Sequence, residues 1–210
     1  GGDGSFGPGD YLVFYAKSPH GISYDAGTQL FTHQYNIYSN YSCYFLCVSG
    51  VGNHKRVNTS SPMSGGASRS VTDYVDYKFS ETDVTNLDQT GQEWFSDLFD
   101  VTLQRSYNFT FPNVKSANAK LTLASASTAT SSSSFSIFIN GNSVGVQNIT
   151  SQSGVVAKLA KNTFDFVPMQ TELSVSLNYN RSLSSTKAYL DYIAIQALCD
   201  LRMNGSQMRF

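Results

Sequence analysis

The chain has 210 residues, a formal net charge of −1 at pH 7 and an isoelectric point near 6.3. Charged residues make up only 14% of it, which excludes the basic surface that nucleic acid or an anionic membrane would need. The length is enough to bury a core in one large β domain or two small ones, and no run approaches the ~18 apolar residues that insertion into a membrane as a helix requires.

Apolar runs in the first fifty residues predict three strands after a lead-in. Residues 1–9 are glycine-rich and are expected to be flexible. Residues 11–16 form a continuous run of aromatic and aliphatic side chains, which predicts a buried strand. Residues 33–38 and 41–48 predict a strand pair joined by a short turn.

The middle of the chain alternates between polar and apolar stretches. Residues 51–70 are polar, contain Pro and Gly, and predict a loop. Residues 74–79 alternate in polarity and predict a strand, and residues 81–89 form an acidic connector. Residues 93–99 are compatible with one helical turn.

From residue 105 onwards the sequence predicts an antiparallel meander. The expected strands lie at residues 107–111, 119–125, 134–139, 143–146, 153–159, 162–166, 172–178 and 187–198. Asn140 and Gly141 sit between two apolar runs and predict a type I′ hairpin. In the closing strand, Tyr189, Asp191 and Ile193 should share one face because side chains alternate along a strand.

Many short, regularly spaced strands are typical of sandwiches and jelly rolls. We therefore predict an all-β fold in which an antiparallel β-sandwich or jelly-roll-like domain covers residues 91–210. A smaller β subdomain, residues 10–90, is expected to precede it.

The sequence offers poor material for catalysis by a thiol. The thiols belong to Cys43, Cys47 and Cys199, and the imidazoles to His20, His33 and His54. The cysteines lie in or beside apolar runs, so we expect buried thiols that pack as small hydrophobes, with a disulfide to the last cysteine as the alternative. Surface or strand-end positions are expected for the histidines. We predict no catalytic residue in this chain.

Metal and cofactor signals are weak. The chain has neither a Cys-X-X-Cys pair nor two spaced histidines, so we predict no zinc site and no cofactor. Glu81, Asp83 and Asp88 form a loose acidic group that would suit calcium, and a solvated acidic loop is the alternative. Asp191 is either a ligand group or a strand-edge residue with local hydrogen bonds.

The most distinctive internal motif is Gly-Gln-Glu-Trp-Phe-Ser-Asp at residues 91–97. Within it, Glu93, Trp94 and Phe95 are the candidate interface residues, since large aromatic side chains anchor many protein–protein contacts. The alternative is an aromatic plug that closes one end of the sandwich.

Several motifs occur in an order and spacing that resemble a known family. They lie at residues 9–16, 33–39, 44–46, 91–97, 109–112, 189–193 and 207–210. Together they resemble the region just upstream of the catalytic domain in PorU-like sortases of the type IX secretion system, which are gingipain-type cysteine peptidases.

The resemblance implies an exported protein at the cell surface or outer membrane of a Gram-negative bacterium. In that family the active-site His lies in a Gly-His-Gly-like stretch of a downstream domain. Here Pro19 precedes His20, so the family's catalytic residues map onto no position of this chain. The implied role is a non-catalytic accessory and scaffolding domain. It would pack on the downstream peptidase domain, with exported cargo or secretion-system proteins as further partners.

A carbohydrate-binding β-sandwich module is the alternative function. Its support is the abundance of aromatic residues, 13 Tyr and 14 Phe, which can stack on sugar rings. The presence of a single Trp weakens it.

Overall fold

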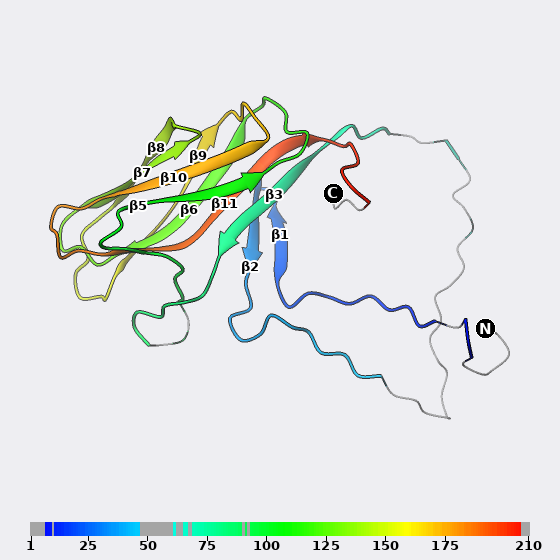
Figure 1. The fold of residues 1–210 in the computed structure, drawn as a ribbon, viewed down its shortest axis with the longest axis horizontal. Helices are drawn as coiled ribbons and strands as arrows, with labels where there is room; N and C mark the ends of the chain where they lie inside the picture. The colour runs from blue at the N-terminus through cyan, green and yellow to red at the C-terminus, as the bar shows by residue number, and fades with distance from the viewer. Residues whose placement is uncertain are drawn as a thin grey trace. The chain divides into compact units, whose positions relative to one another are not determined.

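A computed structural model describes residues 7–9, 11–46, 61, 65–66, 69–89, 91 and 93–206 (Figure 1). The chain divides into two compact units, Gly1–Gly65 and Gly66–Phe210. All strand pairs are antiparallel, and the described residues contain no helix. The predicted all-β class is therefore confirmed. No helix capable of crossing a membrane is found in this part of the chain.

The first unit contains one hairpin, in which β1 (Gly21–Asp25) pairs with β2 (Leu30–Gln34). The turn is closed by Asp25, whose Oδ1 accepts a hydrogen bond of 2.8 Å from the amide of Gly27. This bond, followed by those from Thr28, lowers the pKa of the Asp25 carboxyl. A side-chain cap of this kind is typical of turns that begin with Asp.

Two predictions for the first unit are wrong. Residues 11–16 were expected as a buried strand, but they are exposed and form no strand. Residues 33–38 were expected to pair with residues 41–48, but residues 33–34 end β2, which pairs with β1. The turn that begins at Asp25 joins β1 to β2 instead, and residues 41–46 remain outside any sheet. Residues 47–48 and most of the predicted loop at 51–70 lie outside the described residues.

The second unit is a two-layered sandwich (Figure 1). One sheet has the order β5-β10-β7-β8; the other has the order β3-β11-β6-β9, with β4 also paired to β11. The strands are β3 (Asp73–Glu81), β4 (Leu98–Phe99), β5 (Gln104–Thr110), β6 (Ala119–Ser127), β7 (Ser133–Ile139), β8 (Asn142–Ile149), β9 (Lys158–Phe166), β10 (Glu172–Asn180) and β11 (Ala188–Asp200).

Alternating side chains build the core between the two sheets. In β10, Leu173, Val175 and Leu177 are buried, whereas Ser174 and Ser176 are only half-buried. This is the period of two that a sheet with one buried face requires. The largest fully buried side chains are Phe99, Phe111, Phe135, Leu121, Leu123, Ile137, Ile149, Leu173, Leu177, Leu190, Ile193 and Ile195.

The division between the units falls at Gly65–Gly66, rather than near residue 90 as expected. The reason is β3, which was assigned to the N-terminal subdomain. Along its whole length it pairs with β11, the closing strand of the sandwich. A local reading of the sequence cannot reveal this pairing, because the two strands are separated by more than a hundred residues.

The meander itself agrees with expectation, with local exceptions. Asn140 and Gly141 have φ angles of 50° and 83°, as a type I′ turn requires, which confirms the predicted hairpin. Residues 153–159 and 162–166 were expected as two strands, but they contribute a loop and the single strand β9. The helical turn expected at residues 93–99 is wrong, because Phe95 forms a β-bridge with Thr85 and the next residues lead into β4.

A β-bulge at Asp191 changes which side chains of β11 face the core. Leu190 lies opposite Ser125 and Tyr192 lies opposite Ala124, so Asp191 is the additional residue. Leu190 is in the core before the bulge and Ile193 after it. The prediction that Tyr189 and Ile193 share one face is therefore wrong.

Candidate functional site

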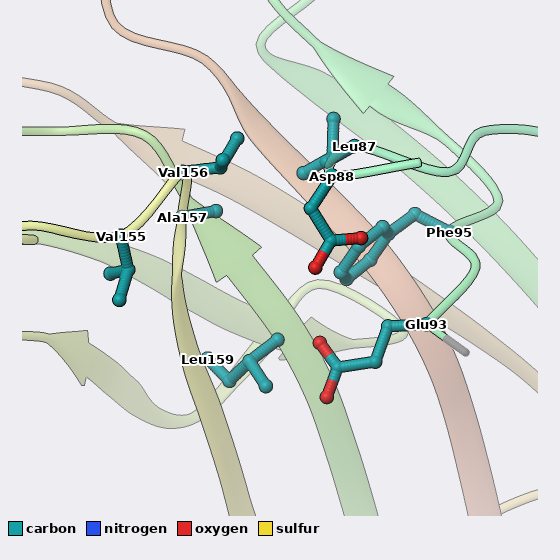
Figure 2. A pocket seen from close by; sticks show the side chains of 8 residues that line it. All are labelled: Leu87, Asp88, Glu93, Phe95, Val155, Val156, Ala157 and Leu159. Carbon is teal, nitrogen blue, oxygen red and sulfur yellow. The ribbon is translucent and has the colours of Figure 1, made fainter. Parts of the chain in front are cut away.

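A pocket of about 210 Å³ lies between two loops on the outer side of the five-stranded sheet. One loop leads from β3 to β4, and the other precedes β9. Figure 2 shows the carboxyl groups of Asp88 and Glu93 on one side of the pocket and the apolar side chains of Val155, Val156 and Leu159 on the other. Leu87, Phe95 and Ala157 complete the lining.

Backbone pairing fixes the first loop on the sheet. The amide of Phe95 donates to the carbonyl of Thr85 at 2.8 Å, and the Thr85 amide donates back at 2.9 Å. One residue further on, the Ser96 amide donates to the carbonyl of Leu190 at 2.7 Å. The Asn86 amide side chain donates to the Glu93 carbonyl at 2.7 Å. The backbone is therefore held at Glu93 by Asn86 and at Phe95 by Thr85.

The three predicted interface residues have different environments. Phe95 is only 3% exposed and packs on Ala126 and Tyr189, with ring centroids of Phe95 and Tyr189 5.8 Å apart. Trp94 is half-buried and donates from Nε1 to the carbonyl of Gly91 at 3.2 Å. Glu93 is exposed, so its side chain is more accessible to a ligand than those of Trp94 and Phe95.

Phe95 therefore has the environment of a plug, but it does not close the end of the sandwich. Ala126 and Tyr189 lie on the outer face of the five-stranded sheet, because their neighbours Ser127 and Leu190 are buried on the inner one. Phe95 covers this outer face and forms the floor of the pocket.

Further carboxylates act on the β11 bulge, together with the pocket residue Glu93. The pKa of Asp191 is raised to about 7, chiefly by burial and then by the negative charges of Glu81, Asp83 and Glu93, while Lys161 opposes them. Three carboxylates therefore act on the bulge from nearby, in addition to the effect of burial. The ammonium of Lys161 lies 5.4 Å from the centre of the Tyr192 ring.

The calcium candidates do not form a metal centre. Within the described part of the chain, no group of three His, Cys, Asp or Glu side chains could hold a metal ion. Glu81, Asp83 and Asp88 thus lie near one another in sequence without gathering as ligands.

The described thiols are free and differ in exposure. Cys199 is fully buried, and burial, followed by the charge of Asp76, raises the pKa of its thiol to about 11. Its expected role as a small hydrophobe is confirmed. Cys43 was expected to be buried but is exposed, because residues 41–46 join no sheet. Cys47 and His54 lie outside the described residues.

The imidazole of His20 is held by contacts with two neighbouring residues. Its Nδ1 accepts a hydrogen bond of 3.0 Å from the amide of Asn36, and its ring stacks on Tyr35 at a centroid distance of 4.2 Å. An imidazole that stacks on a neighbouring ring and accepts a backbone amide holds the turn after β2 against the residue before β1.

Sequence reasoning missed a large apolar surface on the first unit, which we call the aromatic segments: residues 11–17 and 41–46. Tyr15 is 83% exposed and Phe45 92% exposed. The two segments touch where the rings of Phe14 and Tyr44 lie 5.5 Å apart and the Tyr44 hydroxyl donates to the Lys17 carbonyl at 3.0 Å. The signal was present as two apolar runs, but runs of this kind are usually buried.

Comparisons with known proteins give a match at the level of fold. No family model and no curated protein matches the chain. A crystal structure of dimeric latent PorU from Porphyromonas gingivalis is similar with a TM-score of 0.71 and 19% sequence identity, over 93% of this chain and 19% of that chain. The chain shares the fold of that region of PorU. It spans about a fifth of the PorU chain.

Two carbohydrate-binding modules are more distant. The family 36 module in complex with calcium and xylotriose has a TM-score of 0.35 and 16% identity, over 60% of this chain and 99% of that chain. The family 35 module from Clostridium thermocellum has a TM-score of 0.40 and 13% identity, over 60% of this chain and 98% of that chain.

Proposed function

We propose that this chain is a non-catalytic accessory domain of a PorU-like cysteine peptidase of the gingipain type, exported to the surface of a Gram-negative bacterium. Its role is to bind other polypeptide segments, in the first place the peptidase domain that would follow it in the same protein. The fold shared with PorU and the ordered motifs support this assignment.

The exposure of the aromatic segments is the observation that best supports the proposal. Their apolar side chains are exposed, and neither segment pairs in a sheet within the described residues. Burying one large apolar side chain contributes about 1.5–3 kcal/mol, so covering several of them supplies a stable contact. Backbone that is not part of a sheet also suits addition to the edge of a partner's sheet.

The environment of the thiols supports a non-catalytic role. A cysteine nucleophile needs a lowered thiol pKa and access to solvent. Cys199 has neither, since it is buried and its pKa is raised. Cys43 is exposed. If the isolated chain hydrolysed peptides through Cys43 or Cys47, the proposal would fail.

Amide hydrogen exchange on the 210-residue chain and on the longer native protein tests the scaffolding role. We expect exchange in residues 11–17 and 41–46 to be fast in the short chain and slower in the long one by about tenfold or more, because the segments become covered. Equal exchange rates in the two proteins would refute the proposal.

A matched pair of variants tests which side chains matter. Tyr15→Ser combined with Phe45→Ser should weaken association of the short chain with the separately produced remainder of the protein by about tenfold or more, since each removes an anchor. Val101→Ser is the control, because Val101 is 94% exposed in the sandwich unit, and its association should be unchanged. Equal affinity of the double variant and the control would count against the aromatic segments.

One observation favours a second candidate function, the binding of a neutral glycan. The outer face of the four-stranded sheet carries hydroxyl and amide side chains, namely Ser106, Asn108, Ser134, Ser136, Ser174, Ser176, Asn178 and Asn180. The Oδ1 atom of Asn178 is buried and accepts no hydrogen bond, and Phe138, half-buried, offers an aromatic ring on the same face. Amides, hydroxyls and an aromatic ring are the groups that recognise sugars.

A glycan array tests this second candidate. A neutral glycan should bind, and Phe138→Ala or Asn178→Ala should abolish the signal. Thr163→Ala, a replacement in the other sheet, should leave it intact. An array without signals, or a signal that survives both replacements, would exclude this face as a sugar site.

A further inference from the structure

The pocket on the sandwich unit combines two surfaces with different chemistry. One wall is apolar and accessible: it consists of Val155, Val156 and Leu159, whose side chains are 54%, 53% and 48% exposed. The facing side presents the carboxyl groups of Glu93 and Asp88 (Figure 2). A ligand for this pocket must therefore offer both an apolar surface and a positive charge.

The charges at the β11 bulge, which include the pocket residue Glu93, strengthen this requirement. Glu81, Asp83 and Glu93 all act on the carboxyl at the β11 bulge, Asp191, and the cation that opposes them is Lys161. Lys161 lies over the ring of Tyr192. A partly enclosed site with walls of low dielectric constant focuses such a negative potential and raises the local concentration of cations.

The size of the pocket narrows the class of ligand. Pockets for drug-sized molecules enclose about 300–1,000 Å³. At about 210 Å³ this pocket is smaller, and it is open to solvent. Its volume suits a single side chain entering from a polypeptide that lies across the surface.

We propose that this pocket binds a lysine or arginine side chain of a polypeptide partner. The aliphatic stem of the ligand packs against Val155, Val156 and Leu159, and its cationic head pairs with Glu93 and Asp88. Long basic side chains bury their methylene stems in this way while the charged end stays near water. The inference does not depend on the aromatic segments, which belong to the other unit.

The loop that carries Glu93 is held ready for this contact. Phe95 is fixed by its two backbone bonds to Thr85, and the Glu93 carbonyl is fixed by Asn86. Little conformational freedom of the backbone is therefore lost on binding, which favours affinity.

Binding should also release a proton. Burial is the main cause of the raised pKa of Asp191, about 7, and Glu93 adds to it together with Glu81 and Asp83 and against Lys161. A cation placed beside Glu93 offsets part of this negative charge, so the Asp191 carboxyl loses its proton more readily. Proton release at pH 6.5 therefore reports on occupation of this pocket.

Titration of the ¹⁵N-labelled chain with a blocked five-residue peptide tests the proposal. The peptide has a central arginine flanked by leucines, and in the control peptide norleucine replaces arginine. We expect a dissociation constant of about 1 mM or below for the arginine peptide, with amide shifts at Phe95 and Leu159, and at least tenfold weaker binding of the control. Binding should weaken further as salt is added.

Two variants separate the pocket from general attraction to acidic groups. Glu93→Gln should weaken binding of the arginine peptide about tenfold and reduce the proton release, since it removes the paired charge. Glu172→Gln removes an exposed carboxylate of the other sheet and should change neither. The proposal is refuted if the two peptides bind equally, if Glu93→Gln binds as the parent does, or if the shifts fall on residues 11–17.

Discussion

Replacing Asp191 by asparagine is expected to stabilise the protein in a pH-dependent way. The pKa of this carboxyl is raised from 3.8 to about 7, first by burial and then by Glu81, Asp83 and Glu93. The native state therefore keeps a proton that the unfolded chain has released between about pH 4 and pH 7. The free energy of unfolding must fall as the pH rises through this window, and Asp191→Asn removes that fall.

The magnitude follows from the shift. A pKa difference of this size corresponds to about 4 kcal/mol at 1.36 kcal/mol per pH unit. The carboxyl is only partly buried, and solvent screening reduces the expected effect to about 2 kcal/mol. Asp191→Asn should thus have nearly the same stability as the parent at pH 4 and be more stable by about 2 kcal/mol at pH 8.

Urea denaturation at pH 4, 6 and 8 measures this difference. Asp165→Asn is the control, because hydrogen bonds from Asn118 and Lys120 lower the pKa of the exposed Asp165 carboxyl. Its stabilising contribution is present above the unfolded pKa and lost as the pH falls through the folded value, so this variant gains nothing at pH 8. A difference between Asp191→Asn and the parent that stays constant from pH 4 to pH 8 would refute the reasoning.

Three further predictions concern packing and access. Gly145→Ala should destabilise the sandwich by about 1–3 kcal/mol in urea, because its Cβ would lie 2.6 Å from Phe164 Cδ1; adding Phe164→Leu should restore part of the loss. Phe95→Ala should cost about 2–4 kcal/mol by thermal denaturation, since it opens a cavity over β11. In a Cys47→Ser variant, a thiol reagent should label Cys43 within minutes and Cys199 only on unfolding. Fast labelling of both cysteines would contradict the structure.

The sequence predicted the sandwich well because its strands obey simple alternation. Leu173, Val175 and Leu177 are apolar at every second position, and one buried face is the only arrangement that satisfies them. The hairpin at Asn140 and Gly141 was equally accessible, since a type I′ turn needs positive φ at both residues. These are local signals, and they require no knowledge of what lies across the sheet.

The features that escaped prediction depend on distant parts of the chain. The bulge at Asp191 is defined by its register with β6, which the closing strand alone does not reveal. The exposure of residues 11–17 also contradicts their composition, because an apolar run is normally buried. The pocket itself was not predicted. Glu93 and Asp88 were singled out for different roles, and the structure places both at one site.

The position of β11 has a consequence for the order of assembly. This strand is the last in the sequence, yet it lies between β3 and β6 and also carries β4. The five-stranded layer therefore cannot form until residue 200 has emerged from the ribosome. Pairings between segments so far apart in the sequence make folding slow. The polypeptide therefore stays unfolded for longer than a protein built from neighbouring hairpins.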